Sequence, residues 1–539
     1  MGPQMAACRA FQVSLRWGAG AVFLAVLGLV ALGGCGRPPQ GKSTAAEAAA
    51  PPAAGSGASP TTKPGAPPAA KPSPDREIWE VCCLGGVRVG HTRTVIRRIT
   101  RDAQELVHID SLTRLAIRRF GKPMETEVRF TSVETPEGRL VECRSATVQQ
   151  AVSVTTEGRV VGNQLQVKIA TKGKTLSSTI PWSAEYGGFY ALQQSLARTP
   201  MRPGQRRTLR FLDPLTNQVA ASELVARDYQ STKLLEGSGQ LLRIDSVTTL
   251  GDQTSRGVLW TDRAGEIWKS SAEMLNTETF RTTKEIALGE TKSADLDIAW
   301  KVSVPVDRPL VRPHQTRRVR YRVRLDGGDP AKVFTAGPTQ QVRSLDANAA
   351  EVTVYAIRPG DGRGNPNAKD DPPAPQDREP NNWIQSDDPK IAALARQAAG
   401  GRSDPWEVAV ALEKAARGWI RESDYSRGFD SAADVIESRR GDCTEHAVLL
   451  AALVRARGIP ARVAIGLVYK DQTFLYHMWD EVHLGGRWVP LDATLAQGGI
   501  GGAHLKLAHG SLAGASAFAS VLPVAQVAGR LKIEVLEAE

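Results

Sequence analysis

Apolar and polar residues alternate along much of the chain between residues 77 and 300. Clear examples are the segments 87–92, 126–130 and 164–169. A period of two places apolar side chains on one face of a strand and polar ones on the other, which is typical of antiparallel sheets with one solvated face. We therefore predict an antiparallel β domain over residues 77–300, interrupted by one short helix within 187–196.

A second alternating stretch follows, and its clearest strand is residues 318–325. The size of this stretch suits a small β-sandwich-like domain over residues 301–358. Residues 359–382 are rich in Pro, Gly, Asp and Asn, so we expect a linker there. The chain from 383 to 539 is then predicted to form a separate C-terminal domain.

Two helices are expected at the start of this C-terminal domain. The second is predicted to begin at Asp404, because Pro405 suits a first helical position and Glu407 suits the third position after a cap. Its expected buried stripe is Val408, Leu412, Ala415 and Trp419.

A third helix is predicted over residues 444–457, which are rich in Ala and Leu. Gly458 and Pro460 end it, and Gly441-Asp442 breaks the pattern before it. Cys443 therefore lies at or near the first helical turn. The free N–H groups of that turn favour a thiolate and could also hold an oxyanion.

A β-hairpin is predicted from residues 478–484 and 487–492, with Gly485-Gly486 as its turn. Counting back from the turn places Trp479 opposite Asp492. His477 and Asp492 then become diagonal neighbours on one face, with Cα atoms roughly 7–8 Å apart. The opposite face is apolar apart from Asp480, which the pattern does not explain.

Taken singly, each of these residues has an ordinary structural interpretation. A lone Cys is commonly a small buried apolar residue, a lone His is commonly structural, and an Asp after a strand commonly belongs to a turn. Together they supply a nucleophile, a base and a group that orients the base. The sequence therefore predicts a catalytic triad of Cys443, His477 and Asp492.

Residues 383–510 resemble the bacterial transglutaminase-like superfamily, which has a papain-like cysteine fold. The matching segments are Gly441-Asp442-Cys443-Thr444-Glu445-His446-Ala447, Arg455-Ala456-Arg457-Gly458-Ile459-Pro460-Ala461-Arg462, His477-Met478-Trp479 and Trp488-Val489-Pro490-Leu491-Asp492-Ala493-Thr494. The resemblance implies an α+β catalytic core over residues 383–539, following the all-β region of a multidomain chain, and the same triad. It does not fix the reaction, because members include protein cross-linkers, peptidases and amidases, and some have lost the triad. The family often places an oxyanion donor before the Cys helix, and Trp419 and Tyr425 are the candidates.

The N-terminus has the pattern of a targeting segment. Arg9 and Arg16 precede an uncharged apolar run at 17–31, and Leu32-Gly33-Gly34-Cys35-Gly36 resembles a bacterial lipobox. We expect residues 1–35 to be a lipoprotein signal peptide and Cys35 to carry the lipid; a transmembrane anchor is the alternative. Residues 36–76 are rich in Ala and Pro and predict a disordered tether. The protein is thus expected in the bacterial cell envelope, anchored by lipid and facing the periplasm or the exterior.

The net charge and the cysteine content constrain the function less than the motifs do. The net charge is +11, yet the part from Trp383 onward holds 17 basic and 19 acidic residues, so the excess lies upstream. It could favour anionic surfaces, although arginines on solvated strand faces explain it better, and no feature indicates nucleic-acid binding. Cys82 or Cys83 could bridge to Cys143, or all three could be thiols. No CxxC or HExxH spacing occurs, so we expect no metal and no cofactor.

These features predict a membrane-anchored cysteine enzyme that transfers acyl groups from amide bonds of protein or peptide substrates. Resolution of the thioester by water makes a peptidase or amidase, and resolution by an amine makes a transglutaminase, a protein-glutamine acyltransferase. The sequence leaves this choice open, and we favour hydrolysis slightly. The alternative from another class is a non-catalytic envelope binding or assembly protein that uses the β region at 77–358.

Overall fold

A computed structural model describes residues 76–539 except 150–151, 172–173, 215, 252, 291–295, 359–363, 370, 515–516, 518 and 520–521. The predicted signal peptide, the lipidation site Cys35 and nearly all of the predicted tether lie outside the described residues. Within the described part, no helix combines the length and the apolar character needed to cross a bilayer.

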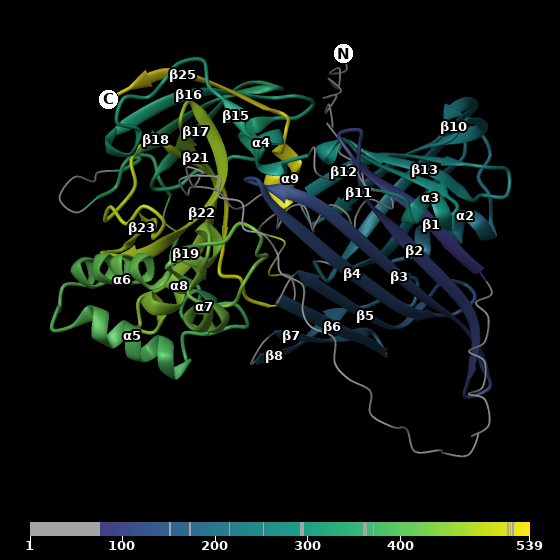
Figure 1. The fold of residues 1–539 in the computed structure, drawn as a ribbon, viewed down its shortest axis with the longest axis horizontal. Helices are drawn as coiled ribbons and strands as arrows, with labels where there is room; N and C mark the ends of the chain where they lie inside the picture. Colours follow the sequence, from purple (N-terminus) through teal and green to yellow (C-terminus); the bar gives the residue numbers. More distant parts are fainter. Residues whose placement is uncertain are drawn as a thin grey trace, which may run out of the picture.

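The first large unit is one antiparallel sheet of fourteen strands, drawn in purple to teal in Figure 1. The strand order is β8-β7-β6-β5-β4-β3-β2-β1-β14-β13-β12-β11-β10-β9. The strands are β1 (Arg76–Leu84), β2 (Val87–Arg101), β3 (Gln104–Arg119), β4 (Lys122–Glu134), β5 (Leu140–Gln149), β6 (Val152–Val161), β7 (Gln164–Thr171), β8 (Lys174–Pro181), β9 (Arg206–Asp213), β10 (Gln218–Lys233), β11 (Ser238–Leu250), β12 (Gln253–Thr261), β13 (Ile267–Ala272) and β14 (Thr277–Thr282). The three alternating segments used for the sequence prediction all lie in these strands.

The sheet curls strongly, so that its two ends approach each other. Leu212 of the edge strand β9 packs in the same apolar cluster as Leu165 and Val167 of β7, near the opposite edge. The short helix expected within 187–196 is present as α2 (Ala191–Arg198). Two shorter helical segments interrupt the region, η1 (Met274–Asn276) and α3 (Lys284–Leu288).

The region predicted as a small sandwich is organised differently. Its strands β16 (Arg318–Leu325), β17 (Gln340–Asp346) and β18 (Ala349–Tyr355) form a four-stranded sheet with β25 (Leu531–Ala538), in the order β17-β18-β16-β25. Strand pairing with a segment more than 200 residues away leaves no local sequence pattern, so the alternation of 318–325 revealed the strand and not its partner. The short elements here are α4 (Ile298–Lys301), β15 (Val304–Pro305), η3 (Pro313–Gln315) and η4 (Pro330–Lys332).

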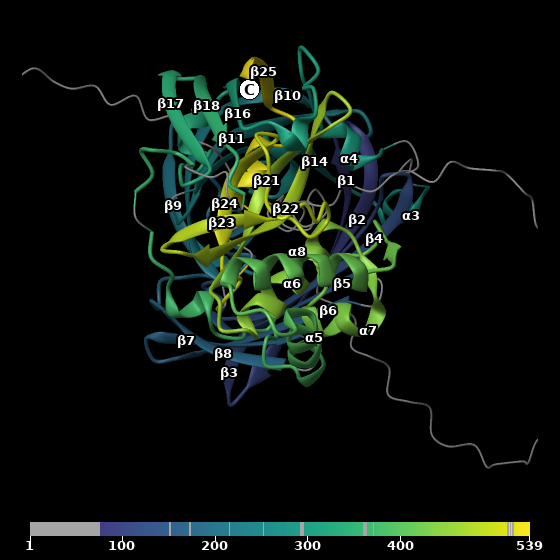
Figure 2. The same cartoon turned by 90° about the vertical axis from the view of Figure 1, so that its left-hand side faces the viewer.

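The C-terminal unit combines helices with a five-stranded sheet of order β15-β22-β21-β24, in which β23 pairs with β22. Helices α5 to α8 lie together on one side in Figure 2. The elements are η5 (Pro375–Asp377), α5 (Pro389–Ala399), α6 (Pro405–Trp419), β19 (Glu422–Ser423), α7 (Ala432–Ser438), β20 (Arg440–Gly441), α8 (Cys443–Arg455), β21 (Ala461–Lys470), β22 (Thr473–Leu484), β23 (Arg487–Leu491), β24 (His504–Gly510) and α9 (Leu522–Val527).

Helix α6 begins as predicted, with the Asp404 side chain accepting a hydrogen bond from the N–H of Glu407. Its buried face is rotated relative to the expected stripe. Glu413 and Ala416 are fully buried, whereas Trp419 is only partly buried. The rotation matters because it places a carboxylate inside the domain.

One apolar cluster joins the curled sheet to the C-terminal unit. It contains Leu115 and Met124 of the β3–β4 hairpin together with Val448 of α8 and Val535 of β25. The two units therefore share a core. The part of the predicted linker that is described also lies against the C-terminal unit, since Arg455 Nη1 donates to the carbonyl of Glu379 at 2.9 Å.

Candidate functional site

Cys443 is the first residue of α8 and is fully buried. The preceding Asp442 caps the helix, because its Oδ1 accepts the N–H of Thr444 at 2.9 Å. Glu445 completes the capping box, since its Oε2 accepts the N–H of Asp442 at 2.8 Å. The thiol therefore sits at the helix end where the helix dipole favours negative charge.

Gly441 is required for this cap on grounds of space. A Cβ at this position would lie 2.3 Å from Cβ of Glu445, and the φ angle of Gly441 is +155°. Any side chain here would push Glu445 away from the backbone it caps. The glycine before Asp442 thus serves close packing as well as breaking the helical pattern.

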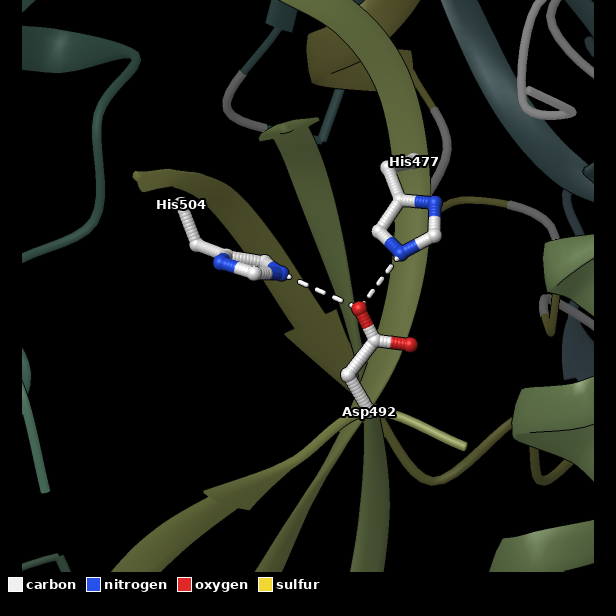
Figure 3. Close-up of side chains that lie close together, drawn as sticks. All are labelled: His477, Asp492 and His504. Carbon is white, nitrogen blue, oxygen red and sulfur yellow. Dashed lines mark hydrogen bonds and ion pairs between the residues drawn. The ribbon is translucent and has the colours of Figure 1, made fainter. Parts of the chain in front are cut away.

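The predicted hairpin register is confirmed. Leu484 pairs with Arg487, His483 with Trp488 and Asp480 with Leu491, around the turn at Gly485-Gly486. This register brings His477 of β22 and Asp492, which follows β23, into contact. Their Nε2 and Oδ2 atoms are 2.8 Å apart (Figure 3).

The proton positions follow from the charge on Asp492. Burial would raise the pKa of this carboxyl, but the charges and hydrogen bonds of His477 and His504 hold the pKa well below its usual range. An ionised carboxylate can only accept, so Nε2 of His477 carries the proton. Nδ1 of His477 is buried and has no hydrogen-bond partner among the described residues. In the neutral ring, this nitrogen is the one with the basic lone pair.

His504 is a member of the site that the sequence reasoning missed. It opens β24, and its Nε2 lies 3.1 Å from the same Oδ2 of Asp492 (Figure 3). Its ring packs edge-on against Trp479, with centroids 5.2 Å apart. Burial lowers the pKa of His504, against the opposing effect of Asp492, and its Nε2–H donates to the Asp492 carboxylate. Two imidazoles thus fix one carboxylate oxygen.

Glu413 is a second missed residue. From the buried face of α6, its Oε1 accepts the N–H of Asp492 at 3.1 Å and its Oε2 accepts the N–H of Gly498 at 2.8 Å. Burial and, to a lesser degree, the charge of Asp492 raise the pKa of Glu413 to about 8. Its position on an otherwise apolar helical stripe was the one available sequence signal. Glu413 holds the backbone that presents Asp492.

Asp480, which the sequence pattern left unexplained, is also fully buried in β22. Neither of its carboxylate oxygens has a hydrogen-bond partner among the described residues. Burial and the nearby charge of Asp492 raise the pKa of Asp480 well above its usual range. Both effects favour its neutral, protonated form, and we have no further physical account of it.

The structure gives different roles to the three other residues considered for the thiol site, His446, Trp419 and Tyr425. His446 Nδ1 lies 2.6 Å from the carbonyl oxygen of Asp442, so His446 is tied to the helix start, and burial lowers its pKa. Trp419 donates its ring N–H to the carbonyl of Ile436 at 3.0 Å. This bond removes Trp419 from the two candidate oxyanion donors. Tyr425 is buried, and its ring packs against that of Phe120 in the β3–β4 turn at an interplanar angle of 53°.

A metal ion could be held only at one group among the described residues, His477, Asp492 and His504, whose ligand atoms all lie within 4.8 Å of one another. Two imidazoles and a carboxylate are suitable ligands for zinc. The two N–H to carboxylate hydrogen bonds already account for this arrangement. Helix α8, which carries Cys443 at its start, packs against β22, which carries His477.

Comparison with known proteins locates one family in this part of the chain. Residues 392–493 match the family profile described as the transglutaminase-like superfamily. No curated protein matches the chain. Similar solved structures include a candidate cysteine protease from Cytophaga hutchinsonii, with 18% identity over 41% of this chain and 86% of that one and a TM-score of 0.26. A β-barrel-like protein of unknown function from Brucella abortus has 12% identity over 38% and 94% of the two chains and a TM-score of 0.27. A candidate protease from Parabacteroides distasonis has 8% identity over 65% and 64% and a TM-score of 0.18.

The profile spans α6, the start of α8 and the β22–β23 hairpin, which are the elements that build the site. Residues 392–493 belong to the transglutaminase-like superfamily.

Proposed function

We propose that this protein is a cysteine enzyme that transfers acyl groups from amide bonds, with Cys443, His477 and Asp492 as its triad. The observation that carries the proposal is the His477–Asp492 contact of 2.8 Å, which leaves the other imidazole nitrogen as a base. Cys443, at the N-terminus of a helix packed on the same strand, supplies the nucleophile.

In this mechanism, Sγ of Cys443 gives its proton to Nδ1 of His477 and bonds to the amide carbon. The C–N bond then breaks as His477 returns the proton to the leaving nitrogen, which leaves a thioester. Water or an amine next attacks the thioester, with His477 again accepting and returning one proton. Asp492 keeps His477 in the required tautomer, and the positive end of the α8 dipole stabilises the oxyanion.

The site is closed in this structure. Cys443 and His477 are both 0% exposed. A substrate carbonyl therefore reaches the thiol only after neighbouring side chains move.

The proposal favours hydrolysis over transfer to an amine, which gives a peptidase or amidase of protein or peptide substrates. A substrate screen that compares release of ammonia, formation of new peptide ends and incorporation of a labelled amine separates the three outcomes. Cys443→Ala is the matched control. A product that forms equally with Cys443→Ala would show that this thiol is not the nucleophile.

We further propose that lipid on Cys35 anchors the enzyme in the bacterial cell envelope. The support is the sequence pattern around Cys35, which lies outside the described residues. Mass spectrometry of the mature N-terminus tests it. An unmodified chain that starts elsewhere than Cys35 contradicts this part of the proposal.

A second candidate function is ligand binding by the large sheet. One observation favours it: a cavity of about 340 Å³ bounded by β1, α2 and β14, with Arg76, Tyr190 and Arg281 in its lining. A cellular phenotype that survives Cys443→Ala but is lost on substituting these lining residues would assign the biological role to binding.

A further inference from the structure

One arginine of the large N-terminal sheet contacts the residue that caps the helix of Cys443. Arg119, the last residue of β3, forms an ion pair with Oδ2 of Asp442, the residue directly before Cys443. The side chains are 0% and 1% exposed. The partners are 323 residues apart in sequence. A buried ion pair of this kind is costly to break, because the remaining charge is left without compensation.

The backbone next to Arg119 is held in an unfavourable conformation. Phe120 and Gly121 form the β3–β4 turn with φ of +49° and +76°, and the first of these is rare for a bulky residue. Two contacts hold Phe120 there. Its ring lies 5.0 Å from that of Tyr425, and its N–H donates to Asp297 Oδ1 at 3.1 Å. The turn is therefore fitted to the segment beside the thiol helix.

The surroundings of Asp442 explain why a cation is needed. Asp430 and Glu445 also lie in this buried group, and the N–H of Asp430 donates to Oε1 of Glu445 at 3.1 Å. Burial, followed by the charges of Asp442 and Asp430, raises the pKa of Glu445 well above its usual range. Arg427 pairs with Asp430, which leaves Arg119 to compensate Asp442. Further titratable or charged groups around this cluster are His446, which is bound to the Asp442 carbonyl, and Asp434, Asp424 and Arg417.

We propose that Arg119 is a positioning residue of the thiol site, so that the N-terminal sheet completes the active site of the C-terminal domain. This inference rests on the proposed function of Cys443. The carboxylate of Asp442 caps α8 and belongs to the residue directly before Cys443, so an uncompensated negative charge there opposes a thiolate. Arg119 cancels that charge and leaves the cap in place.

The balance of charge around Asp442 predicts that two single variants shift the apparent pKa of Cys443 in opposite directions. Arg119→Met leaves Asp442 uncompensated and should raise the apparent pKa of Cys443. Asp442→Asn keeps a capping side chain but removes a negative charge next to Cys443 in the sequence, and should therefore lower the apparent pKa of Cys443. The double variant should return close to the wild-type profile. If Arg119 and Asp442 served packing alone, both single variants would impair the reactivity of Cys443 in the same way.

The experiment measures alkylation of Cys443 in the full chain by iodoacetamide between pH 5 and pH 9, with each cysteine resolved by mass spectrometry. Below the pKa, we expect roughly tenfold slower labelling in Arg119→Met and faster labelling in Asp442→Asn, since one pKa unit is a tenfold change in thiolate. Cys443 is 0% exposed, so the reagent reaches it only through the opening that admits substrate, and each labelling rate is compared with the plateau of the same variant at high pH. Cys82 is 1% exposed within the sheet strand β1, and burial raises its pKa to about 12, so its protection reports an intact sheet in each variant.

Slower labelling in Asp442→Asn, or an unchanged profile in Arg119→Met with Cys82 protected, overturns the inference. If Arg119→Met exposes Cys82, that variant no longer tests the inference. The direction in which Asp442→Asn shifts the apparent pKa of Cys443 then tests it alone. His477→Ala tests the proposed function separately. An unchanged Cys443 profile in His477→Ala refutes the thiol–imidazole pair, and the signs of the other two variants still show whether Arg119 controls the thiol.

Discussion

The two halves of the candidate site are built in different ways. His477 and Asp492 meet because one short hairpin has one register, which the turn at Gly485-Gly486 sets. Cys443 depends on distant elements, since its cap contacts Arg119 from the large sheet and its capping box contacts the backbone of Asp430. Local sequence can specify the first half, whereas only the complete fold can specify the second.

The largest expected effect is the loss of all chemistry on removal of the nucleophile. Cys443→Ala should abolish acyl transfer and labelling by a thiol-directed amide probe. The unfolding temperature should change little, because Ala occupies most of the same buried space. Residual labelling at other cysteines is the control, and full activity of the variant would refute the assignment.

The hairpin half is tested most directly by Asp492→Asn. The amide can impose the wrong tautomer on His477, so kcat/KM should fall by roughly three to four orders of magnitude. Circular dichroism and thermal unfolding should change far less than activity. Activity within a few-fold of the wild type would mean that Asp492 does not orient the base.

Glu413 tests whether the hairpin half also needs outside support. Burial raises its folded-state pKa to about 8, above the unfolded value near 4.5. A raised pKa stabilises the folded state fully below the unfolded pKa, and this contribution is lost as pH rises to about 8. The free energy of unfolding of the wild type, relative to Glu413→Gln, should therefore fall by roughly a few kcal/mol between pH 4.5 and pH 8. Denaturant titrations of both proteins at several pH values measure how the free energy of unfolding depends on pH. The same pH dependence in the wild type and in Glu413→Gln would contradict the prediction.

The smallest expected effect concerns the cap of the thiol half. Gly441→Ala forces a Cβ against Glu445 and should destabilise the fold by about 1–3 kcal/mol. Gly418→Ala, in α6, is the matched control, because no atom lies within 4 Å of its added Cβ. That control should be neutral or stabilising by about 0.5–1 kcal/mol. Chemical denaturation measures both, and equal effects would remove the case for close packing at Gly441.

The same contrast explains how much the sequence could predict. The helix that begins at Cys443, the cap at Asp404 and the His477–Asp492 contact all depend on residues within about twenty positions of one another. Arg119 reaches the site from the distant large sheet. His504 is only 12 positions from Asp492, but a loop separates them, and the pairing of β24 with β21 decides where His504 lies. No periodicity records which distant strand end will face a given helix. The pairing of β25 with β16 was missed for the same reason.

Glu413 is an intermediate case. A carboxylate on a helical stripe of apolar residues is unusual, and its burial could have been suspected from the period alone. Its partners, the N–H groups of Asp492 and Gly498, could not, because they come from a loop. Sequence patterns can therefore indicate a buried polar group before they indicate its purpose.

The apolar cluster shared by the two units has a consequence for folding. Leu115 and Met124, from the first quarter of the chain, pack in one core with Val448 and with Val535 near residue 539. During synthesis, the hairpin of β3 and β4 emerges long before the residues that cover it. Contacts so far apart in sequence slow folding and leave apolar surface exposed to aggregation. We expect the thiol site to form last, after the C-terminal strand has packed into this core.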